Sequence, residues 1–314
     1  MTRRLRRPIS AGRYRIAGGW LAACLLFACS PAMAQSGRQV QMDFGGMTLN
    51  GWLTEVDQPR ATILMLHGTL AHANMEIMAT LAEVFAEYGV ETLRVTLSLG
   101  VSDRTGMFPC DALQEHRQAD AKEELSAWMR WLEEKGRPDV LVLGHSRGAA
   151  QVARFAVEGE EPGPVGLILV APAVSTPGGL AASYERRTGT ALEPLVDEAR
   201  RRIEDGKPAS VMSDGSFLHC GEGDVTAQTF VAYYGEDDGV DALELVQGLS
   251  MPVIVIAGSD DPLTTELGPQ AAALAEAGEI EFFTVDGADH FFRDLYAYDA
   301  VEAVTGWLGE AVAR

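Results

Sequence analysis

Six short segments of the chain are apolar at almost every position. They are Ala61–Leu66, Val90–Leu97, Val140–Leu143, Val165–Val170, Val253–Ala257 and Ile280–Val285. Continuous rather than alternating apolarity indicates strands that are buried on both faces, as in a parallel sheet. Two earlier segments, Val40–Phe44 and Thr48–Thr54, are joined by Gly45-Gly46, and this pattern is typical of an antiparallel hairpin.

Segments with helical periodicity lie between these apolar segments. Their apolar residues recur every three or four positions, opposite a charged face, in Met75–Tyr88, Gln118–Glu134, Gly148–Glu158, Leu267–Ala277 and Ala297–Val312. Strands that alternate with helices predict an α/β fold, with a mostly parallel, doubly wound sheet and right-handed crossovers.

The stretch from Ala173 to about Asp224 interrupts this alternation. It contains no clear strand, and at about fifty residues it is too long for a plain loop. A helical pattern over Glu193–Asp205 lies within it. We therefore predict a small helical insertion over about residues 173–224, which forms a lid at the carboxyl end of the sheet and is not an independent domain.

Residues 1–34 have the features of a signal peptide. A basic region is followed by the apolar run Ile16–Phe27, which is too short to span a membrane. The sequence Ala32-Met33-Ala34 then provides a small–x–small cleavage site. We expect residues 1–34 to be removed on export and residues 35–314 to form the mature domain, in the periplasm or the medium.

The four cysteines leave two questions open. The sequences that end at Cys24 and Cys29 resemble lipoboxes, so a protein anchored to the membrane by acylation of one of them is the alternative to simple export. Only Cys110 and Cys220 lie in the mature domain. In an oxidising compartment they can form a disulfide, and the alternative is two buried free thiols.

The charge of the mature domain is strongly negative. The whole chain has a formal net charge of −20. Because residues 1–34 hold six arginines and no acidic residue, the remainder carries −26. This charge excludes a general affinity for DNA or RNA, since nothing would compensate the repulsion from phosphates. Strongly anionic substrates are also disfavoured, unless Arg104 or Arg147 receives them.

The segment Gly144-His-Ser146-Arg147-Gly148 is the most informative part of the chain. It follows an apolar strand and opens a helix, and such a Gly-x-Ser-x-Gly turn presents a nucleophilic serine at strained backbone dihedrals. Small residues on both sides leave the space that the crowded backbone needs. The helix N-terminus favours negative charge that develops beside Ser146. The alternative is a tight turn with an idle serine.

A nucleophilic serine needs a base and an acid that orients the base. His290 follows the last predicted strand on a polar loop and is the candidate base. Asp261 follows the preceding strand and is the candidate acid. Asp260 is an alternative that fits the Gly-x-x-Asp spacing less well. Asp286 and Asp289 are further alternatives, which we expect in turns. The order Ser146, Asp261, His290 along the chain is that of an α/β fold with a nucleophilic serine.

Two further strand ends contribute candidate residues. After the strand that ends at Leu66, Gly68 allows a close turn, so that the backbone N–H groups of Thr69 and Arg147 can form an oxyanion hole. We expect His67 to be structural.

The loop after Leu97 holds Asp103-Arg104, either as substrate ligands or as a solvated pair. It also holds Cys110, so that a disulfide to Cys220 would join the lid to the rest of the domain.

Together the His-Gly loop, the elbow around Ser146, the Gly-Ser-Asp-Asp loop and the Asp-His loop resemble the α/β-hydrolase superfamily over nearly the whole mature chain. The resemblance implies an acyl-enzyme mechanism with Ser146 as nucleophile, His290 as base and Asp261 as its partner. A serine at position 146 argues against the dehalogenase and epoxide-hydrolase branches, which use aspartate. Arg147 departs from the family, which often has an apolar residue there, and its side chain could reach a substrate carboxylate or an acid of the lid.

We therefore expect an exported serine hydrolase that cleaves small or medium carboxylic esters or thioesters, with neither a cofactor nor a metal. A lipase, a lysophospholipase or a peptidase on the same fold is the alternative within the enzymes. A secreted binding protein without catalysis is the alternative outside them, because the fold alone does not prove activity. The sequence leaves the oligomeric state open.

Overall fold

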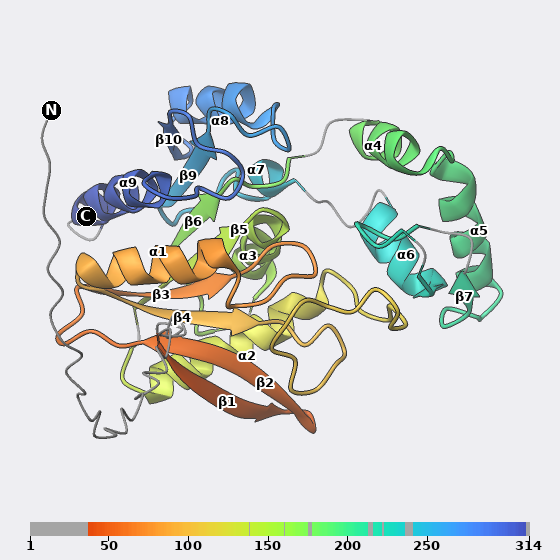
Figure 1. The fold of residues 1–314 in the computed structure, drawn as a ribbon, viewed down its shortest axis with the longest axis horizontal. Helices are drawn as coiled ribbons and strands as arrows, with labels where there is room; N and C mark the ends of the chain where they lie inside the picture. The colour runs from red at the N-terminus through yellow and green to blue at the C-terminus, as the bar shows by residue number, and fades with distance from the viewer. Residues whose placement is uncertain are drawn as a thin grey trace, which may run out of the picture. The chain divides into compact units, whose positions relative to one another are not determined.

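An eight-stranded sheet runs through the domain, in the order β1-β2-β4-β3-β5-β6-β9-β10 (Figure 1). Its first three strands are antiparallel neighbours and all other neighbouring pairs are parallel. The strands are β1 (Arg38–Phe44), β2 (Met47–Thr54), β3 (Ala61–Leu66), β4 (Val90–Thr96), β5 (Val140–His145), β6 (Gly166–Val170), β9 (Val253–Gly258) and β10 (Glu281–Val285). The predicted hairpin and the six predicted strands are confirmed, with ends that differ by at most two residues. Five of the six are buried as expected, whereas β10 lies at the edge of the sheet and is largely exposed.

This computed structural model describes residues 37–137, 139–159, 161–174, 178–212, 216–221, 223–235 and 241–311. They belong to one unit, residues 35–314. The predicted signal peptide, with Cys24 and Cys29, lies outside the described residues. No described helix is both long and apolar enough to cross a bilayer.

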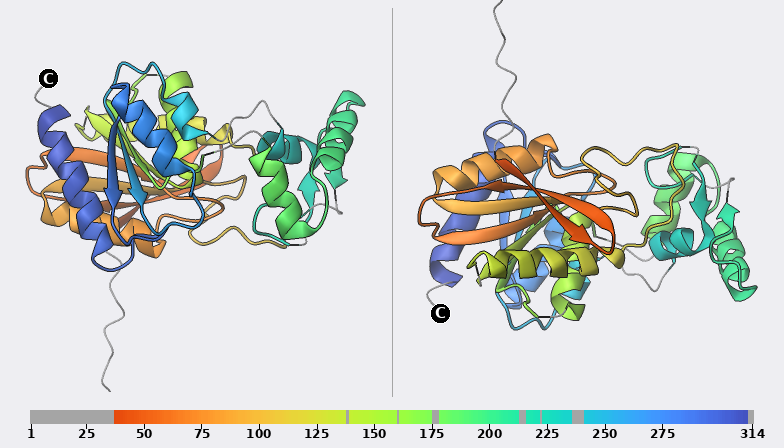
Figure 2. Two further views of the ribbon diagram at one scale, coloured as in Figure 1. Left: turned by 90° about the horizontal axis from the view of Figure 1, so that it is seen from above. Right: turned by 90° about the horizontal axis from the view of Figure 1, so that it is seen from below.

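Helices cover both faces of the sheet (Figure 2). Strand β3 shows why its apolar run is continuous: Ile63 and Met65 belong to one core, and Leu64 and Leu66 to the other. The first core is closed by α1 (Glu76–Glu87) and α9 (Tyr296–Ala311). The second is closed by α2 (Asp120–Glu134), α3 (Arg147–Glu158), α7 (Ala242–Leu245) and α8 (Leu267–Glu276).

The chain between β6 and α7 forms a separate group of short elements, which we call the lid (Figure 1). They are α4 (Gly179–Thr188), α5 (Glu193–Glu204), β7 (Val211–Met212), β8 (Val225–Thr226) and α6 (Ala227–Tyr234). Helical structure therefore continues beyond residue 224. The predictions omit α6 because nearly all its residues are buried, which leaves no charged face to reveal its period.

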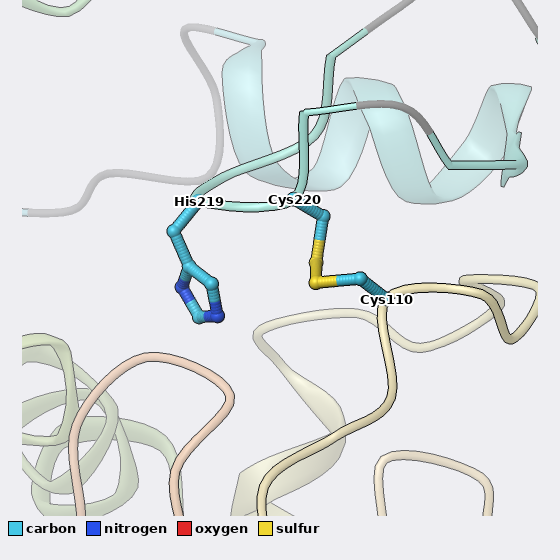
Figure 3. Close-up of side chains that lie close together, drawn as sticks. All are labelled: Cys110, His219 and Cys220. Atoms are coloured by element: carbon cyan, nitrogen blue, oxygen red, sulfur yellow. A yellow bond between two sulfur atoms is a disulfide. The ribbon is translucent and has the colours of Figure 1, made fainter.

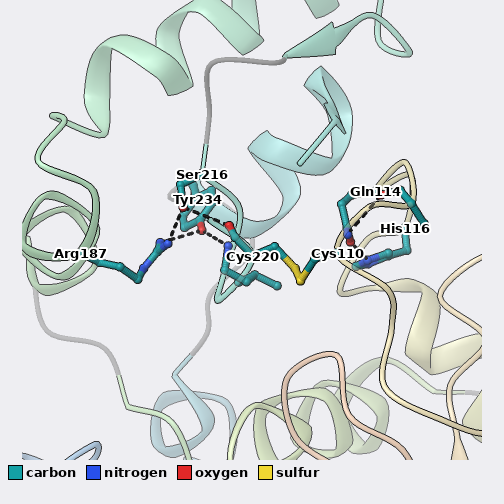
Figure 4. Close-up of a disulfide and its surroundings, with 9 residues drawn as sticks. Cys110, Gln114, His116, Arg187, Ser216, Cys220 and Tyr234 are labelled. Atoms are coloured by element: carbon teal, nitrogen blue, oxygen red, sulfur yellow. Dashed lines mark hydrogen bonds between the residues drawn. A yellow bond between two sulfur atoms is a disulfide. The ribbon is translucent and has the colours of Figure 1, made fainter. Parts of the chain in front are cut away.

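A disulfide between Cys110 and Cys220 joins the lid to the loop that follows β4 (Figure 4). Their Cα atoms lie 5.3 Å apart, across 110 residues of sequence. Close by, the backbone N–H of Gln114 donates to Asp224 O and the N–H of Thr226 donates to Gln114 O. The loop and the lid are thus tied by a covalent bond and by two backbone hydrogen bonds.

Candidate active site

Ser146 occupies the sharp turn between β5 and α3. Its φ of 55° and ψ of −124° lie outside the regions that ordinary residues prefer. The turn is held by hydrogen bonds from Ser146 N to Val170 O and from the N–H groups of Ala149 and Ala173 to Ser146 O. Such a strained residue persists only where its surroundings fix it, and strain of this kind is typical of functional sites.

The positions two residues before and after Ser146 must be glycine, because neighbouring backbone atoms leave no space for a side chain. A Cβ atom on Gly144 would lie 2.4 Å from Gly148 O, and one on Gly148 would lie 2.3 Å from His67 O. Both distances are far inside van der Waals contact. The Gly-x-Ser-x-Gly pattern therefore allows α3 to pack directly against the ends of β3 and β5.

Three side chains form a chain of hydrogen bonds that begins at Ser146. Ser146 Oγ lies 2.9 Å from His290 Nε2, and His290 Nδ1 lies 2.7 Å from Asp261 Oδ2. Asp261 also accepts hydrogen bonds from Thr264 Oγ1 and from Leu263 N. Burial raises the pKa of Asp261, but the hydrogen bonds from His290 and Thr264 outweigh burial and hold that pKa below its usual value. Asp261 is therefore ionised at neutral pH and orients the ring of His290.

The other three acids considered for this position serve the turns around it. Asp260 and Asp286 each accept a hydrogen bond from Ser259 Oγ. Asp289 accepts from Phe291 N and pairs with Arg293. Of the four candidates, the structure brings only Asp261 to His290. The acid and base loops touch at Gly258, where a Cβ would lie 2.4 Å from Ala288 O.

The backbone around Ser146 offers two hydrogen-bond donors. A Cβ on Gly68 would lie 3.2 Å from Ser146 Cβ, so the loop after β3 passes directly beside the serine. In the described part of the chain, neither Thr69 N nor Arg147 N donates to a backbone carbonyl. The N–H of Arg147 also stands at the N-terminus of α3, where the helix dipole favours negative charge. These two N–H groups are therefore free to bind an anionic oxygen.

His145 supports the position of His290, although no role for His145 was expected from the sequence. Its Nε2 donates to His290 O at 2.9 Å, and the two imidazole rings are 4.9 Å apart. Burial lowers the pKa of His145 to about 4, so its ring is neutral and the hydrogen bond fixes the backbone of His290. A polar residue between Gly144 and Ser146, at the end of a buried strand, could have indicated from the sequence that His145 lies inside the site.

His67 has a structural position, as the sequence analysis expects. Its Nε2 accepts from Leu97 N at 3.1 Å, and its Nδ1 donates to Gly68 O at 2.8 Å. Burial lowers the pKa of His67 to about 3, which keeps the ring neutral. His67 thus joins the end of β3 to the chain after β4.

Arg104 is not part of a solvated pair with Asp103. Arg104 is only 6% exposed, and its guanidinium donates to Leu97 O, Ala71 O and Gly106 O at 2.6–2.7 Å. Asp103 instead accepts from Asn50 and Gln41. Arg104 is enclosed because Ala71 and the chain from Leu97 to Gly106 direct three carbonyl groups at one point, and it does not line the cavity beside Ser146.

The side chain of Arg147 lies between the elbow and the lid. Its Nε donates to Thr69 Oγ1 and its Nη1 donates to Gln118 Oε1, both at 3.1 Å. Its guanidinium carbon is 5.3 Å from the centre of the Tyr233 ring, on α6. The partner that the lid provides is thus an aromatic ring, and among the described residues no acidic side chain pairs with Arg147.

A cavity of about 400 Å³ opens at Ser146 and His290. Most of the side chains that line it are apolar: Met75, Ile77, Met78, Met107, Leu263 and Phe291. The lid contributes His219, which stands next to the disulfide (Figure 3). His219 and the two cysteine sulfurs lie close enough to suggest a metal site, but the disulfide occupies both sulfurs and leaves no pair of thiolates.

This fold and this arrangement of a serine, a histidine and a carboxylate define a hydrolase of the α/β type. Residues 63–304 match the alpha/beta hydrolase family, which is more than half of the chain. The protein therefore belongs to the alpha/beta hydrolase family, as its four loops predict. No curated protein sequence shows significant similarity to the chain.

Solved structures share the fold at low sequence identity. Est1E from Butyrivibrio proteoclasticus, with ferulic acid bound, has a TM-score of 0.60 at 19% identity, over 88% of this chain and 100% of Est1E. An esterase of Pyrococcus furiosus has a TM-score of 0.57 at 15% identity, over 95% of this chain and 96% of its own. A monoglyceride lipase of Saccharomyces cerevisiae, in complex with a substrate analogue, has a TM-score of 0.60 at 14% identity, over 89% and 97%.

Proposed function

We propose that this protein is an exported serine hydrolase that cleaves carboxylic esters or thioesters through an acyl-enzyme on Ser146. The observation that carries the proposal is the continuous hydrogen-bonded chain from Ser146 through His290 to Asp261. The buried, ionised Asp261 keeps the Nδ1–H of His290 directed away from the serine. Nε2 is then free to accept the serine proton.

In the first half of the reaction, Ser146 Oγ attacks the ester carbonyl carbon and its proton passes to His290 Nε2. The carbonyl oxygen becomes an oxyanion, which the N–H groups of Thr69 and Arg147 bind. The C–O bond to the alcohol then breaks, and His290 returns the proton to the leaving alcohol. Water repeats the sequence on the acyl-enzyme and releases the acid. Each backbone donor in such a hole typically contributes about 3–4 kcal/mol to the lowering of the barrier.

The lining of the cavity favours substrates whose group next to the ester is apolar. Three methionines among the lining residues adapt to different shapes, so the cavity is suited to a range of acyl or alkyl groups. The ferulic acid bound to Est1E and the substrate analogue in the yeast monoglyceride lipase support ester chemistry on this fold. A volume of about 400 Å³ favours a small or medium ester over a long-chain lipid.

Labelling with a fluorophosphonate probe tests the proposal directly. The wild-type protein should be labelled and should hydrolyse nitrophenyl esters, whereas Ser146→Ala should abolish labelling and lower turnover by several orders of magnitude. Ser102→Ala is the matched control, because Ser102 is an exposed loop residue that accepts a hydrogen bond from Thr48 N. A folded wild-type protein that is neither labelled nor active would favour a binding protein instead.

A panel of nitrophenyl esters of increasing acyl length tests the substrate class. Activity should be greatest on short and medium chains. Activity confined to long chains would favour the lipase or lysophospholipase, and activity confined to peptide amides would favour the peptidase.

Export is a separate part of the proposal. Its support is the order of basic region, apolar run and cleavage site in residues 1–34. The mass of the exported protein should correspond to a chain that begins at Gln35. A mass that includes a lipid on Cys24 or Cys29 would establish the anchored form.

A further inference from the structure

Arg147 contributes two different groups to the region around Ser146. Its backbone N–H stands at the N-terminus of α3, beside Ser146, and its side chain turns back to the neighbouring loop, where Nε donates to Thr69 Oγ1 at 3.1 Å. Thr69 contributes the other donor of that hole through its own backbone N–H. One side-chain hydrogen bond therefore connects the two residues that supply the two donors.

The same guanidinium also reaches the lid. Nη1 donates to Gln118 Oε1, and Gln118 Nε2 lies 3.5 Å from Ala232 O on α6. The guanidinium carbon lies over the ring of Tyr233, the next residue of α6, at 5.3 Å from its centre. Arg147 is thus held between the loop of Thr69 and a helix that is more than eighty residues away in sequence.

Tyr233 is itself fixed by a buried histidine. The Nε2 of His116 must carry its proton, because its partner at 2.9 Å is the carbonyl oxygen Oε1 of Gln114. The Nδ1 of His116 therefore accepts the hydroxyl proton of Tyr233, at 2.9 Å. The backbone of Gln114 is paired with the lid at Asp224 and Thr226. Arg147 is consequently one end of a connected set of contacts that extends to the loop of Cys110. Figure 4 shows Gln114 and His116 on that loop, beside the disulfide.

The loop of Thr69 needs such support. It belongs to no helix or strand, and Leu70 adopts a φ of 51°, which an L residue rarely takes. A donor stabilises an oxyanion only when its nitrogen lies about 2.7–3.1 Å from the negatively charged oxygen. The rigid fork of a guanidinium holds several acceptors in one geometry, which the single flexible ammonium of lysine does not.

We infer that Arg147 is a positioning residue, whose side chain holds the N–H of Thr69 in the oxyanion hole and connects that hole to helix α6 of the lid. The inference rests on the proposed function and adds to it a role for Arg147, the elbow residue that departs from the family pattern. It predicts that loss of the guanidinium impairs the transition state rather than the binding of substrate.

The test compares Arg147→Met with Arg154→Met. Arg154 lies on the same helix, where it pairs with Glu158 away from the cavity, so its replacement should leave kcat and KM at wild-type values. In Arg147→Met we expect kcat to fall about tenfold or more, with KM within about twofold, because a small displacement of a donor has effects of this size. A trifluoromethyl ketone, which adds to Ser146 and forms an oxyanion, should bind more weakly by the same factor as kcat falls.

Thr69→Val provides the second arm, because it removes the acceptor Oγ1 and keeps both the backbone N–H and Arg147. It should lower kcat and trifluoromethyl ketone affinity in parallel, and the double variant should lose little more than the larger single variant. This arm also carries the test if Arg147→Met does not fold. Arg147→Lys should recover only part of the lost kcat.

The inference is overturned if both Arg147→Met and Thr69→Val keep wild-type kcat, or if they raise KM alone, which would indicate contact with the substrate. It is equally overturned if their losses multiply in the double variant. In each of these cases the active, fluorophosphonate-labelled wild-type protein leaves the proposed function intact. A wild-type protein without labelling or turnover would overturn the proposed function and this inference with it.

Discussion

The sheet and the lid of this protein are held in different ways. The inner parallel strands, from β4 to β9 in the order of the sheet, are bonded to neighbours on both sides and buried between two apolar cores, so the positions of their ends are fixed many times over. Strand β10 lies at the edge of the sheet and is bonded to β9 alone. The lid is joined to the rest of the domain by a small number of specific contacts. They include the Cys110–Cys220 disulfide, the backbone pairing of Gln114, the hydrogen bond between His116 and Tyr233, and the contacts of Arg147 and Gln118 with α6. Apolar side chains of the lid also pack into the second core.

Because of this difference, the sheet and the lid make different contributions to the site. Ser146, Asp261 and His290 follow β5, β9 and β10, so the groups proposed to carry out the chemistry stand on the rigid part. The lid contributes one wall of the cavity through His219. Changes in the sheet should therefore affect turnover, whereas changes in the lid outside α6, whose Tyr233 contacts Arg147, should first affect stability and substrate affinity. The following predictions test that division.

The largest contrast is expected between two glycines. In Gly148→Ala the new Cβ would lie 2.3 Å from His67 O, so α3 and β3 cannot keep their spacing and activity should fall by orders of magnitude. Gly206, at the end of lid helix α5, has a φ of 75°, and a Cβ atom added there would meet no other atom within 4 Å. Gly206→Ala should cost only the backbone strain of about 1 kcal/mol and leave kcat unchanged. Denaturant unfolding and nitrophenyl ester turnover measure both, and equal losses in the two variants would contradict the division.

The disulfide is expected to have the next largest effect. Replacing both cysteines by serine should lower the free energy of unfolding by about 2–5 kcal/mol, since the bond closes a long loop. His219 is adjacent to Cys220, so KM should rise more than kcat falls. Urea unfolding and steady-state kinetics of the double variant, beside the oxidised wild-type protein, provide the measurement. A lower kcat at constant KM would mean that the lid acts on the chemistry directly.

Per pH unit, the pH dependence of stability gives the smallest effect. Burial, followed by the charges of Arg104 and Arg147, lowers the pKa of His116 to about 3. Below pH 6.5 the unfolded chain therefore binds a proton that the folded protein does not, and stability falls as the pH drops from about 6.5 towards 3. His116 should contribute about 1.4 kcal/mol per pH unit within this window.

His116→Gln removes that titration, so its unfolding free energy should fall less steeply with decreasing pH than that of the wild-type protein. The comparison requires urea unfolding at several pH values between about 6.5 and 4.5. His67 and His145, whose pKa values burial lowers to about 3 and about 4, remain in both proteins and provide the common background. Parallel pH profiles for the two proteins would show that His116 does not titrate between the states.

Much of the sheet could be predicted because the burial of a strand is visible in the residues of that strand alone. A strand covered on both faces needs apolar residues at every position, and a segment such as Val253–Gly258 shows this without reference to any other part of the chain. That Ser146, Asp261 and His290 lie close together could be predicted in turn, because parallel strands end at one edge of the sheet and each of these residues follows such a strand. The lid gave weaker signals: α6 is buried on nearly all sides, and β7 and β8 have two residues each.

The sequence by itself determined the strands, the four loops that carry the chemistry, and hence the family. The tertiary structure decided which of four neighbouring acids meets His290, that Arg104 is enclosed by carbonyl groups, and that Arg147 reaches an aromatic ring of the lid. The physical reason is the range of the interactions. Periodicity and turn chemistry act between near neighbours in the chain, whereas the partners of a long polar side chain are set by segments that only the folded backbone brings together.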